Sequence, residues 1–157
     1  HEINLTDFKE LQSFWLEKLV LNNCKIENLE FLNTTSLIFL VVNDCRLKDI
    51  SKLSDASLIR LEISKTLVVD ISPIKYKDIL VLNLEHCKIE NLEVLLTLKK
   101  LETLIITPNS LAPGWDQIIY KMKDQIRQIS ISKSIPTTTA SQFVDVYKNY
   151  NYKNQHK

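Results

Sequence analysis

The chain is very poor in glycine, which excludes several classes of protein. It holds one Gly in 157 residues. Phosphate-binding loops, dinucleotide-binding turns and flexible linkers each need several glycines, because other residues neither reach positive φ easily nor leave room for a close backbone approach. The composition therefore argues against nucleotide-binding folds of these kinds and against a flexible linker between domains.

Long apolar runs and an excess of one charge are lacking as well. No stretch of the sequence approaches the roughly 18 consecutive apolar residues of a membrane-spanning helix. The formal net charge is +1, with 25% charged and 45% hydrophobic residues, which is ordinary for a globular protein. We therefore expect no membrane segment in this chain and no nucleic acid as its partner.

Metal-binding and catalytic patterns are also absent. The three cysteines form no Cys-x-x-Cys pair, and no histidine follows them at zinc-ligand spacing. His86 stands next to Cys87, a base beside a nucleophile, but alternation along a strand turns the two side chains apart. We expect no metal, no cofactor and no catalytic residue, and we interpret His86 as a surface residue.

What the chain does have is a leucine-rich spacing that returns about every 21 residues. Each row reads L-x-x-L-x-L-x-x-C-x-L, with conservative replacements, and the rows begin at Leu16, Leu37, Leu58, Ile79 and Leu101. Such a period is typical of a solenoid, in which stacking of neighbouring units, rather than any single unit, makes the core.

Within each row the alternating part predicts a short strand, and the spacing in threes that follows predicts a helical or 3₁₀ turn. We therefore predict an α/β fold, a right-handed solenoid with a curved parallel sheet on its concave face and short helical turns on its convex face. Ile126, Ile129 and Ile131 add a sixth strand after a longer insert. The first five strands are predicted at Lys18–Asn22, Phe39–Asn43, Arg60–Ser64, Val81–Glu85 and Thr103–Thr107.

The two ends of the chain differ. Residues 1–15 continue the phase backwards through Ile3, Leu5, Phe8 and Leu11, like the tail of a repeat whose strand is missing, so we expect a longer parent protein. At the other end, Thr139 and Gln142 form a capping box before an apolar stripe through Phe143, Val146, Tyr147 and Tyr150. We predict one domain, 1–157: a partial repeat 1–15, regular repeats 16–111, a longer last repeat 112–135, and a cap helix with tail 136–157.

One slot of the row holds a small polar side chain in every unit. Its inward group is expected to satisfy backbone carbonyls where the chain turns off each strand. A disulfide between neighbouring units stays open, since adjacent strands lie about 5 Å apart. Free thiols favour a reducing compartment, although the compartment itself is not determined by the sequence. The slot is occupied by Cys24, Cys45, Thr66, Cys87 and Asn109.

These rows resemble the leucine-rich repeat family, in the short 21- to 22-residue form of bacterial internalin-like proteins. The resemblance covers residues 3–111 and, more loosely, 112–135. The chain departs from it where Cys or Thr replaces the more common Asn. The end, with a Trp115-led helix, a further strand and Ala140–Phe143, is similar to repeat regions attached to some planctomycete and Lentisphaera serine/threonine protein kinases. No kinase motif is present in this chain.

The resemblance implies a surface that binds another protein. Outward side chains of the predicted strands align in columns, with Phe39, Val41, Val20 and Val81 as an apolar centre. β-propensity alone is the alternative explanation of these apolar residues. A regulatory segment of a larger enzyme is the alternative function, and self-association at the exposed N-terminal edge is a further expectation. The predicted partner-binding residues are Lys18, Val20, Phe39, Val41, Arg60, Glu62, Val81, Asn83, Glu85 and Ile105.

Overall fold

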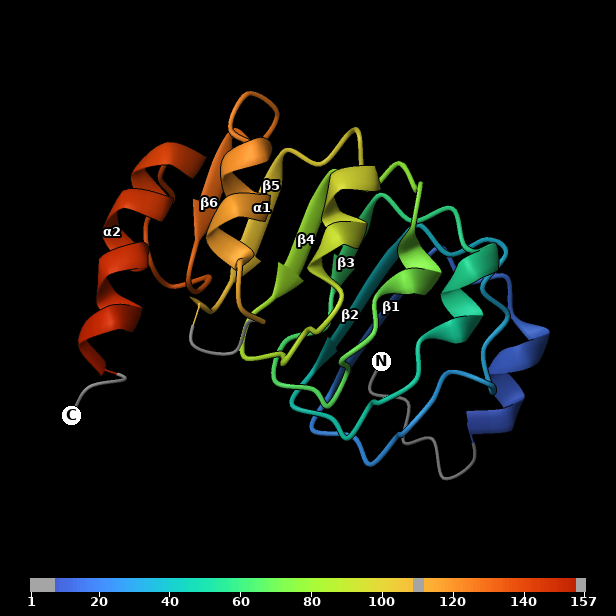
Figure 1. The fold of residues 1–157 in the computed structure, drawn as a ribbon. Helices are drawn as coiled ribbons and strands as arrows, with labels where there is room; N and C mark the ends of the chain where they lie inside the picture. Colours follow the sequence, from blue (N-terminus) through green and yellow to red (C-terminus); the bar gives the residue numbers. More distant parts are fainter. Residues whose placement is uncertain (1–7, 109–111, 155–157) are drawn as a thin grey trace.

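A computed structural model describes residues 8–108 and 112–154 of the chain (Figure 1). It has an α/β fold with one six-stranded sheet in which every neighbouring pair is parallel and the strand order follows the sequence. The predicted fold class is confirmed at this level. The strands are β1 Lys18–Asn22, β2 Phe39–Asn43, β3 Arg60–Glu62, β4 Val81–Leu84, β5 Thr103–Ile106 and β6 Gln128–Ser130.

The register of the sheet repeats the sequence period. Lys18 pairs with Phe39, Phe39 with Arg60, and Arg60 with Val81, in steps of 21 residues. β1 and β2 match the predicted strands residue for residue, whereas β3, β4 and β5 end one or two residues earlier. At β4 a side chain ends the strand, because Asn83 Oδ1 accepts the Glu85 N–H at 2.8 Å.

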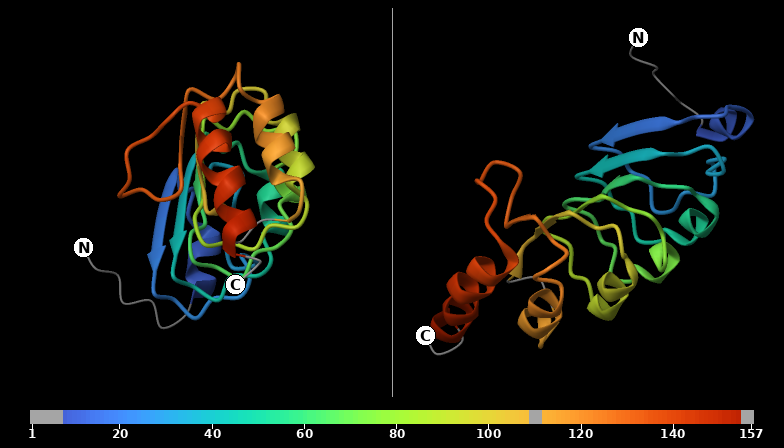
Figure 2. Two further views of the ribbon diagram at one scale, coloured as in Figure 1. Left: turned by 60° about the vertical axis from the view of Figure 1, so that its left-hand side comes forward. Right: turned by 90° about the horizontal axis from the view of Figure 1, so that it is seen from above.

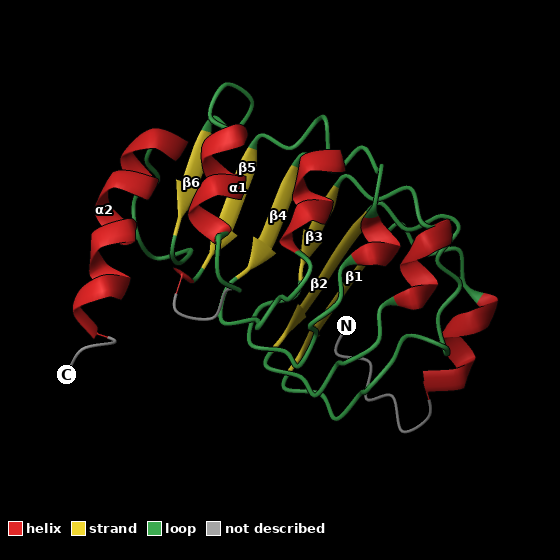
Figure 3. Ribbon diagram, viewed as in Figure 1, coloured by secondary structure: helices red, strands yellow, loops and turns green. Residues whose placement is uncertain are grey.

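Short helices lie on one face of the sheet (Figure 3), and the other face carries no described helix (Figure 2). After β1 the described chain makes turns instead of a helix, and the Glu30 N–H donates there to Asn28 Oδ1 at 3.1 Å. The 3₁₀ helices are η1 Phe8–Ser13, η2 Ser51–Asp55, η3 Ser72–Ile74 and η4 Leu92–Thr97, and the α-helices are α1 Trp115–Lys121 and α2 Ala140–Asn154.

The core lies between the sheet and these helices. Leu40, Leu61, Leu82 and Leu104 occupy equivalent strand positions and are fully buried. Burial of each such side chain contributes about 1.5–3 kcal/mol. Because every unit supplies the same inward leucines, the core is continuous from β1 to β6.

α2 packs against α1 and β6 at the C-terminal end of the sheet (Figure 1). The predicted capping box is present: the Gln142 N–H donates to Thr139 Oγ1 at 3.3 Å, and the Thr139 N–H donates to Gln142 Oε1 at 3.1 Å. The buried Phe143 ring meets the Trp115 ring edge-on at a centroid distance of 5.9 Å. These contacts cover the last strand.

Several expectations lie outside the described residues. Ile3, Leu5, Asn109 and Leu111 belong to this group, as do the side chains of Phe8 and Tyr150. Within residues 8–108 and 112–154, no helix is long and apolar enough to cross a membrane.

Candidate binding surface on the open sheet face

The open sheet face is the side of the sheet turned away from the helices, and it lies on the inside of the curve of the molecule (Figure 2). The parallel register brings the predicted columns together. Lys18, Phe39, Arg60 and Val81 are neighbours across four strands. Beside them runs the second column, Val20, Val41, Glu62, Asn83 and Ile105.

The N-terminal half of this face is accessible. It contains a hollow of about 370 Å³. Val20 is 46% exposed and Phe39 is 38% exposed, so an apolar floor meets solvent between basic side chains. Exposed apolar clusters with a polar rim are typical of protein-binding surfaces. The hollow is lined by Lys18, Val20, Phe39, Val41, Arg60 and Glu62.

The C-terminal half is covered by the chain itself. The strap, residues 131–138 between β6 and α2, stands out on the open side of the sheet as the orange loop in Figure 2. Two backbone hydrogen bonds between Ile129 and Thr138, of 3.0 and 2.8 Å, close its neck. The Lys133 ammonium pairs with the Glu62 carboxylate, and the Lys133 N–H donates to Glu85 Oε2 at 3.4 Å.

Glu62 is the centre of this contact. Its side chain is 1% exposed, and Arg60 Nε donates to its Oε1 at 2.6 Å. Burial opposes ionisation of Glu62, but the hydrogen bonds and charges of Lys133 and Arg60 outweigh it and hold the pKa of Glu62 below its ordinary value. The carboxylate therefore stays ionised and ties the strap to β3.

This arrangement corrects part of the predicted surface. Glu62, Asn83 and Ile105 were expected to face solvent, and that expectation is wrong, because all three are buried. To reach Glu62 from the end of β6, the strap crosses β5 and β4. Strand alternation places these residues on the correct face, but it carries no information about a later loop that covers them. Val81 and Glu85 are partly exposed, and the other predicted residues line the hollow.

The strap was missed because its Ser-Ile-Pro-Thr-Thr-Thr run only indicated that the repeat pattern ends. One signal was available. A carboxylate and an amide at Glu62 and Asn83 occupy a column that otherwise holds Val20, Val41 and Ile105. A carboxylate among β-branched neighbours indicates a charged partner, and Lys133 is that partner for Glu62. Asn83 has no such partner: its Oδ1 accepts the local Glu85 N–H, and its buried Nδ2 has no hydrogen-bond partner among the described residues.

The small-residue slot is a ladder of hydrogen bonds. Cys45 Sγ accepts the Cys24 N–H at 3.2 Å and donates to the Asn43 carbonyl at 3.3 Å. Cys87 Sγ donates to the Ile63 carbonyl at 2.7 Å and lies 3.4 Å from Thr66 Oγ1. The four described slot residues, Cys24, Cys45, Thr66 and Cys87, thus satisfy backbone carbonyls, as predicted. The three thiols are free, so the disulfide left open between Cys24 and Cys45 does not form.

Burial distinguishes the thiols of the ladder. It raises the pKa of both Cys45 and Cys87 above the ordinary thiol value. His86 is exposed while Cys87 is buried, so the two side chains diverge as expected, and the His86 ring nitrogen Nε2 lies 3.7 Å from Glu85 Oε1. Raised pKa values lower the reactivity of the Cys45 and Cys87 thiols.

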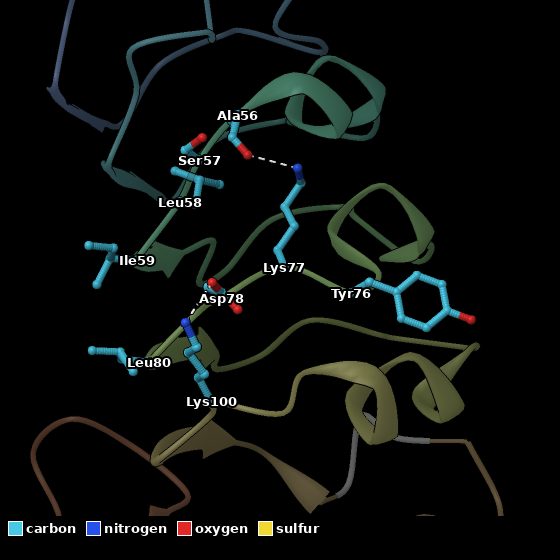
Figure 4. A pocket seen from close by; sticks show the side chains of 9 residues that line it. All are labelled: Ala56, Ser57, Leu58, Ile59, Tyr76, Lys77, Asp78, Leu80 and Lys100. Atoms are coloured by element: carbon cyan, nitrogen blue, oxygen red, sulfur yellow. Dashed lines mark hydrogen bonds and ion pairs between the residues drawn. The ribbon is translucent and has the colours of Figure 1, made fainter.

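A second hollow, of about 520 Å³, lies at the N-terminal ends of β3 and β4 (Figure 4). Its polar groups bind one another: Lys77 Nζ donates to the carbonyls of Ser54 and Ala56 at 2.7 Å each, and Lys100 pairs with Asp78 at 2.7 Å. Burial lowers the pKa of Lys77. No sequence pattern pointed to this hollow, and its internal pairing serves the fold. Among the described residues, no cluster of His, Cys, Asp and Glu is suited to a metal ion.

No protein-family model matches the chain, and no curated protein matches its sequence.

Proposed function

We propose that the chain is a leucine-rich-repeat solenoid without catalytic activity that binds another protein through the hollow on its open sheet face. The observation that carries the proposal is the exposed apolar floor of Val20, Phe39 and Val41 between basic side chains. A regular sheet built from one repeated unit supports the solenoid, and the hydrogen-bonded thiol ladder supports it as well.

The surface fits protein binding better than chemistry. The hollow is small, about 370 Å³, and its one buried carboxylate, Glu62, is neutralised by Arg60 and Lys133. An acid–base catalyst instead needs a group with a pKa near neutrality beside a substrate cavity. Apolar side chains presented on a rigid sheet, by contrast, are good anchors for a partner because little conformational entropy is lost on binding.

The test is a peptide-display selection on the whole chain, counter-selected on the double variant Phe39→Ser/Val41→Ser. The matched control is Leu67→Ser/Val69→Ser, which removes two exposed apolar residues outside the sheet. We expect peptides that bind the wild type and the control but lose binding to the Phe39/Val41 variant by at least about tenfold.

Unfolding curves separate binding from stability. Because Phe39 and Val41 are only partly buried, we expect the double variant to lose less than about 2 kcal/mol of unfolding free energy. A larger loss means that these residues belong to the core. Peptides that bind all three proteins equally refute the proposed surface.

A further inference from the structure

The hollow carries an excess of positive charge at its solvent side, and this excess defines its ligand. Lys18 is exposed and forms no ion pair or side-chain hydrogen bond with any described residue. Arg60 and Lys133 share the single carboxylate of Glu62. Among the residues that line the hollow, Lys18 and Arg60 against Glu62 leave a net charge of +1. Lys133 and Glu85 lie outside the lining and add one charge of each sign.

The geometry turns these charges outward. The Glu62 side chain is 1% exposed, whereas Arg60 is 42% and Lys133 is 49% exposed. A ligand in the hollow therefore meets guanidinium and ammonium groups, with the carboxylate beneath them. Glu85 accepts the Lys133 N–H and lies beside His86, and like Lys133 it is outside the lining of the hollow.

The floor between the cations is apolar and small. A volume of about 370 Å³ is at the lower end of the roughly 300–1,000 Å³ of pockets that enclose small ligands. It fits one or two side chains of an extended segment. Val20 and Phe39 are available to pack against an apolar side chain, which leaves Lys18 and Arg60 at its flanks.

We propose that the hollow binds an acidic segment of a partner protein, in which an apolar side chain is flanked by carboxylates. This inference rests on the proposed function and names its partner class. A basic segment is the opposite alternative: it would have to displace Lys133 from Glu62 and open the strap.

The test uses two capped hexapeptides with the same Leu-Phe centre, one flanked by two Asp/Glu residues on each side and one flanked by two Lys residues on each side. Binding to the isotope-labelled whole chain is followed by amide chemical shifts. We expect the acidic peptide to bind with a dissociation constant below about 1 mM and to shift amides of β1, β2 and β3. Raising NaCl from about 0.05 to about 0.5 M should weaken it, because screening shortens the reach of exposed charges.

Charge reversal at one site gives the sharper readout. Lys18→Glu should weaken the acidic peptide about fivefold or more, whereas Lys25→Glu, at an exposed lysine outside the sheet, should change it less than twofold. No shift with the acidic peptide, or equal binding of both peptides, overturns the inference.

Preferential binding of the basic peptide also overturns the inference, and loss of that binding in Glu62→Gln would assign it to strap displacement.

Failure of the proposed function can be distinguished from failure of the acidic-partner inference. If display yields neutral or basic peptides that depend on Phe39 and Val41, the binding surface stands and only the acidic partner is wrong. If neither display nor the peptides detect binding at Phe39 and Val41, the proposed function itself is overturned.

Discussion

Asn23, Asp44, Lys65 and His86 hold the same left-handed backbone conformation just after their strands, with φ between 52° and 58°. Asn and Asp adopt this conformation at low cost, because their short side chains form local hydrogen bonds, whereas Lys does not. The same turn is therefore made after β1, β2, β3 and β4 from residues of unequal suitability. At Lys65 the tertiary structure imposes a left-handed backbone conformation that lysine disfavours.

Lys65→Asn is expected to stabilise the chain by about 0.5–1 kcal/mol, because it relieves the left-handed strain while the Lys65 N–H keeps its bond to the Glu85 carbonyl. Urea unfolding measures the change. Lys88→Asn is the control, since it removes the same charge from an exposed site without positive φ. Equal effects of the two substitutions would argue against backbone strain as the cause.

The three thiols should differ in reactivity. Cys24 is half-buried at the first rung, whereas Cys45 and Cys87 are buried and have raised pKa values. We expect one thiol to react quickly with an aromatic disulfide reagent at about pH 8 and two to react only on unfolding. Cys24→Ser should remove the fast phase. Three equal rates would contradict a closed ladder.

The raised thiol pKa values also set a sign for stability against pH. The fold favours the protonated thiols, so the unfolded chain ionises first as pH rises past the ordinary value of 9.0. The contribution of Cys45 and Cys87 to stability is therefore complete below that pH and is lost above it. Thermal unfolding between about pH 7 and 10 should show the decline.

At the scale of elements, one ion pair ties the strap to β3. Lys133→Met removes the ammonium and leaves Glu62 to Arg60 alone. We expect a loss of about 1–2 kcal/mol, less than for a fully buried pair because Lys133 is half-exposed. Hydrogen exchange should quicken in residues 131–138. Lys48→Met, which breaks the exposed pair with Glu27, is the control and should cost less than about 0.5 kcal/mol.

Acid should also weaken the contact between the strap and the sheet, because it protonates Glu62, the partner of Lys133. The pKa of Glu62 is lowered in the fold, so its stabilisation is present above the ordinary value of 4.5 and is lost as pH falls through the lower, folded value. Protection factors of the strap amides, which correct for the intrinsic pH dependence of exchange, should therefore fall once the pH drops below 4.5, and less so in the Lys133→Met variant. Protection factors that do not change with acid would show that Glu62 does not hold the strap.

Helix α2 should be held to the sheet through one side, and Phe143 is its central contact. Phe143→Ala removes a fully buried ring that packs against Trp115 and Tyr147. We expect a loss of about 3–5 kcal/mol in urea unfolding. Val146→Ala, an exposed position on the same helix, should cost less than about 1 kcal/mol. Similar losses at both positions would mean that α2 does not pack as described.

At the scale of the whole molecule, the two ends of the sheet differ. α2 packs beside β6, but no described strand pairs with β1 on its outer side. Phe14 and Trp15 are exposed next to this edge. An unpaired strand beside exposed aromatic residues favours association.

We therefore expect the chain to self-associate through the β1 edge, with a mass by light scattering that rises with concentration. Phe14→Ser/Trp15→Ser should lower the association. Tyr76→Ser is the control, because Tyr76 is as exposed as Trp15, at 74%, but lies away from the edge. A monomeric mass at every concentration would exclude association through this edge.

Strands and register were predictable because both follow from local alternation and a fixed period. Leu40 and Val42 are buried, as the alternating spacing predicts, and the strand Phe39–Asn43 forms as expected. The strand ends at Glu62 and Leu84 were less predictable, because side-chain hydrogen bonds such as that of Asn83 compete with the ladder. Of the candidate surface, Phe39, Val41 and Lys18 were identified from the columns, but the cover over Glu62 was not.

The repeat of leucines by itself determined which residues form strands, which face they bury and which strand lies beside which, because each unit can bury its apolar side chains only against the next. The tertiary structure alone decided how much of the sheet remains open. Lys133 meets Glu85, 48 residues earlier in the chain, and Glu62 beyond it. Contacts between residues so far apart in the sequence depend on where the loop lies in the folded chain. The period of the repeat carries no information about that position.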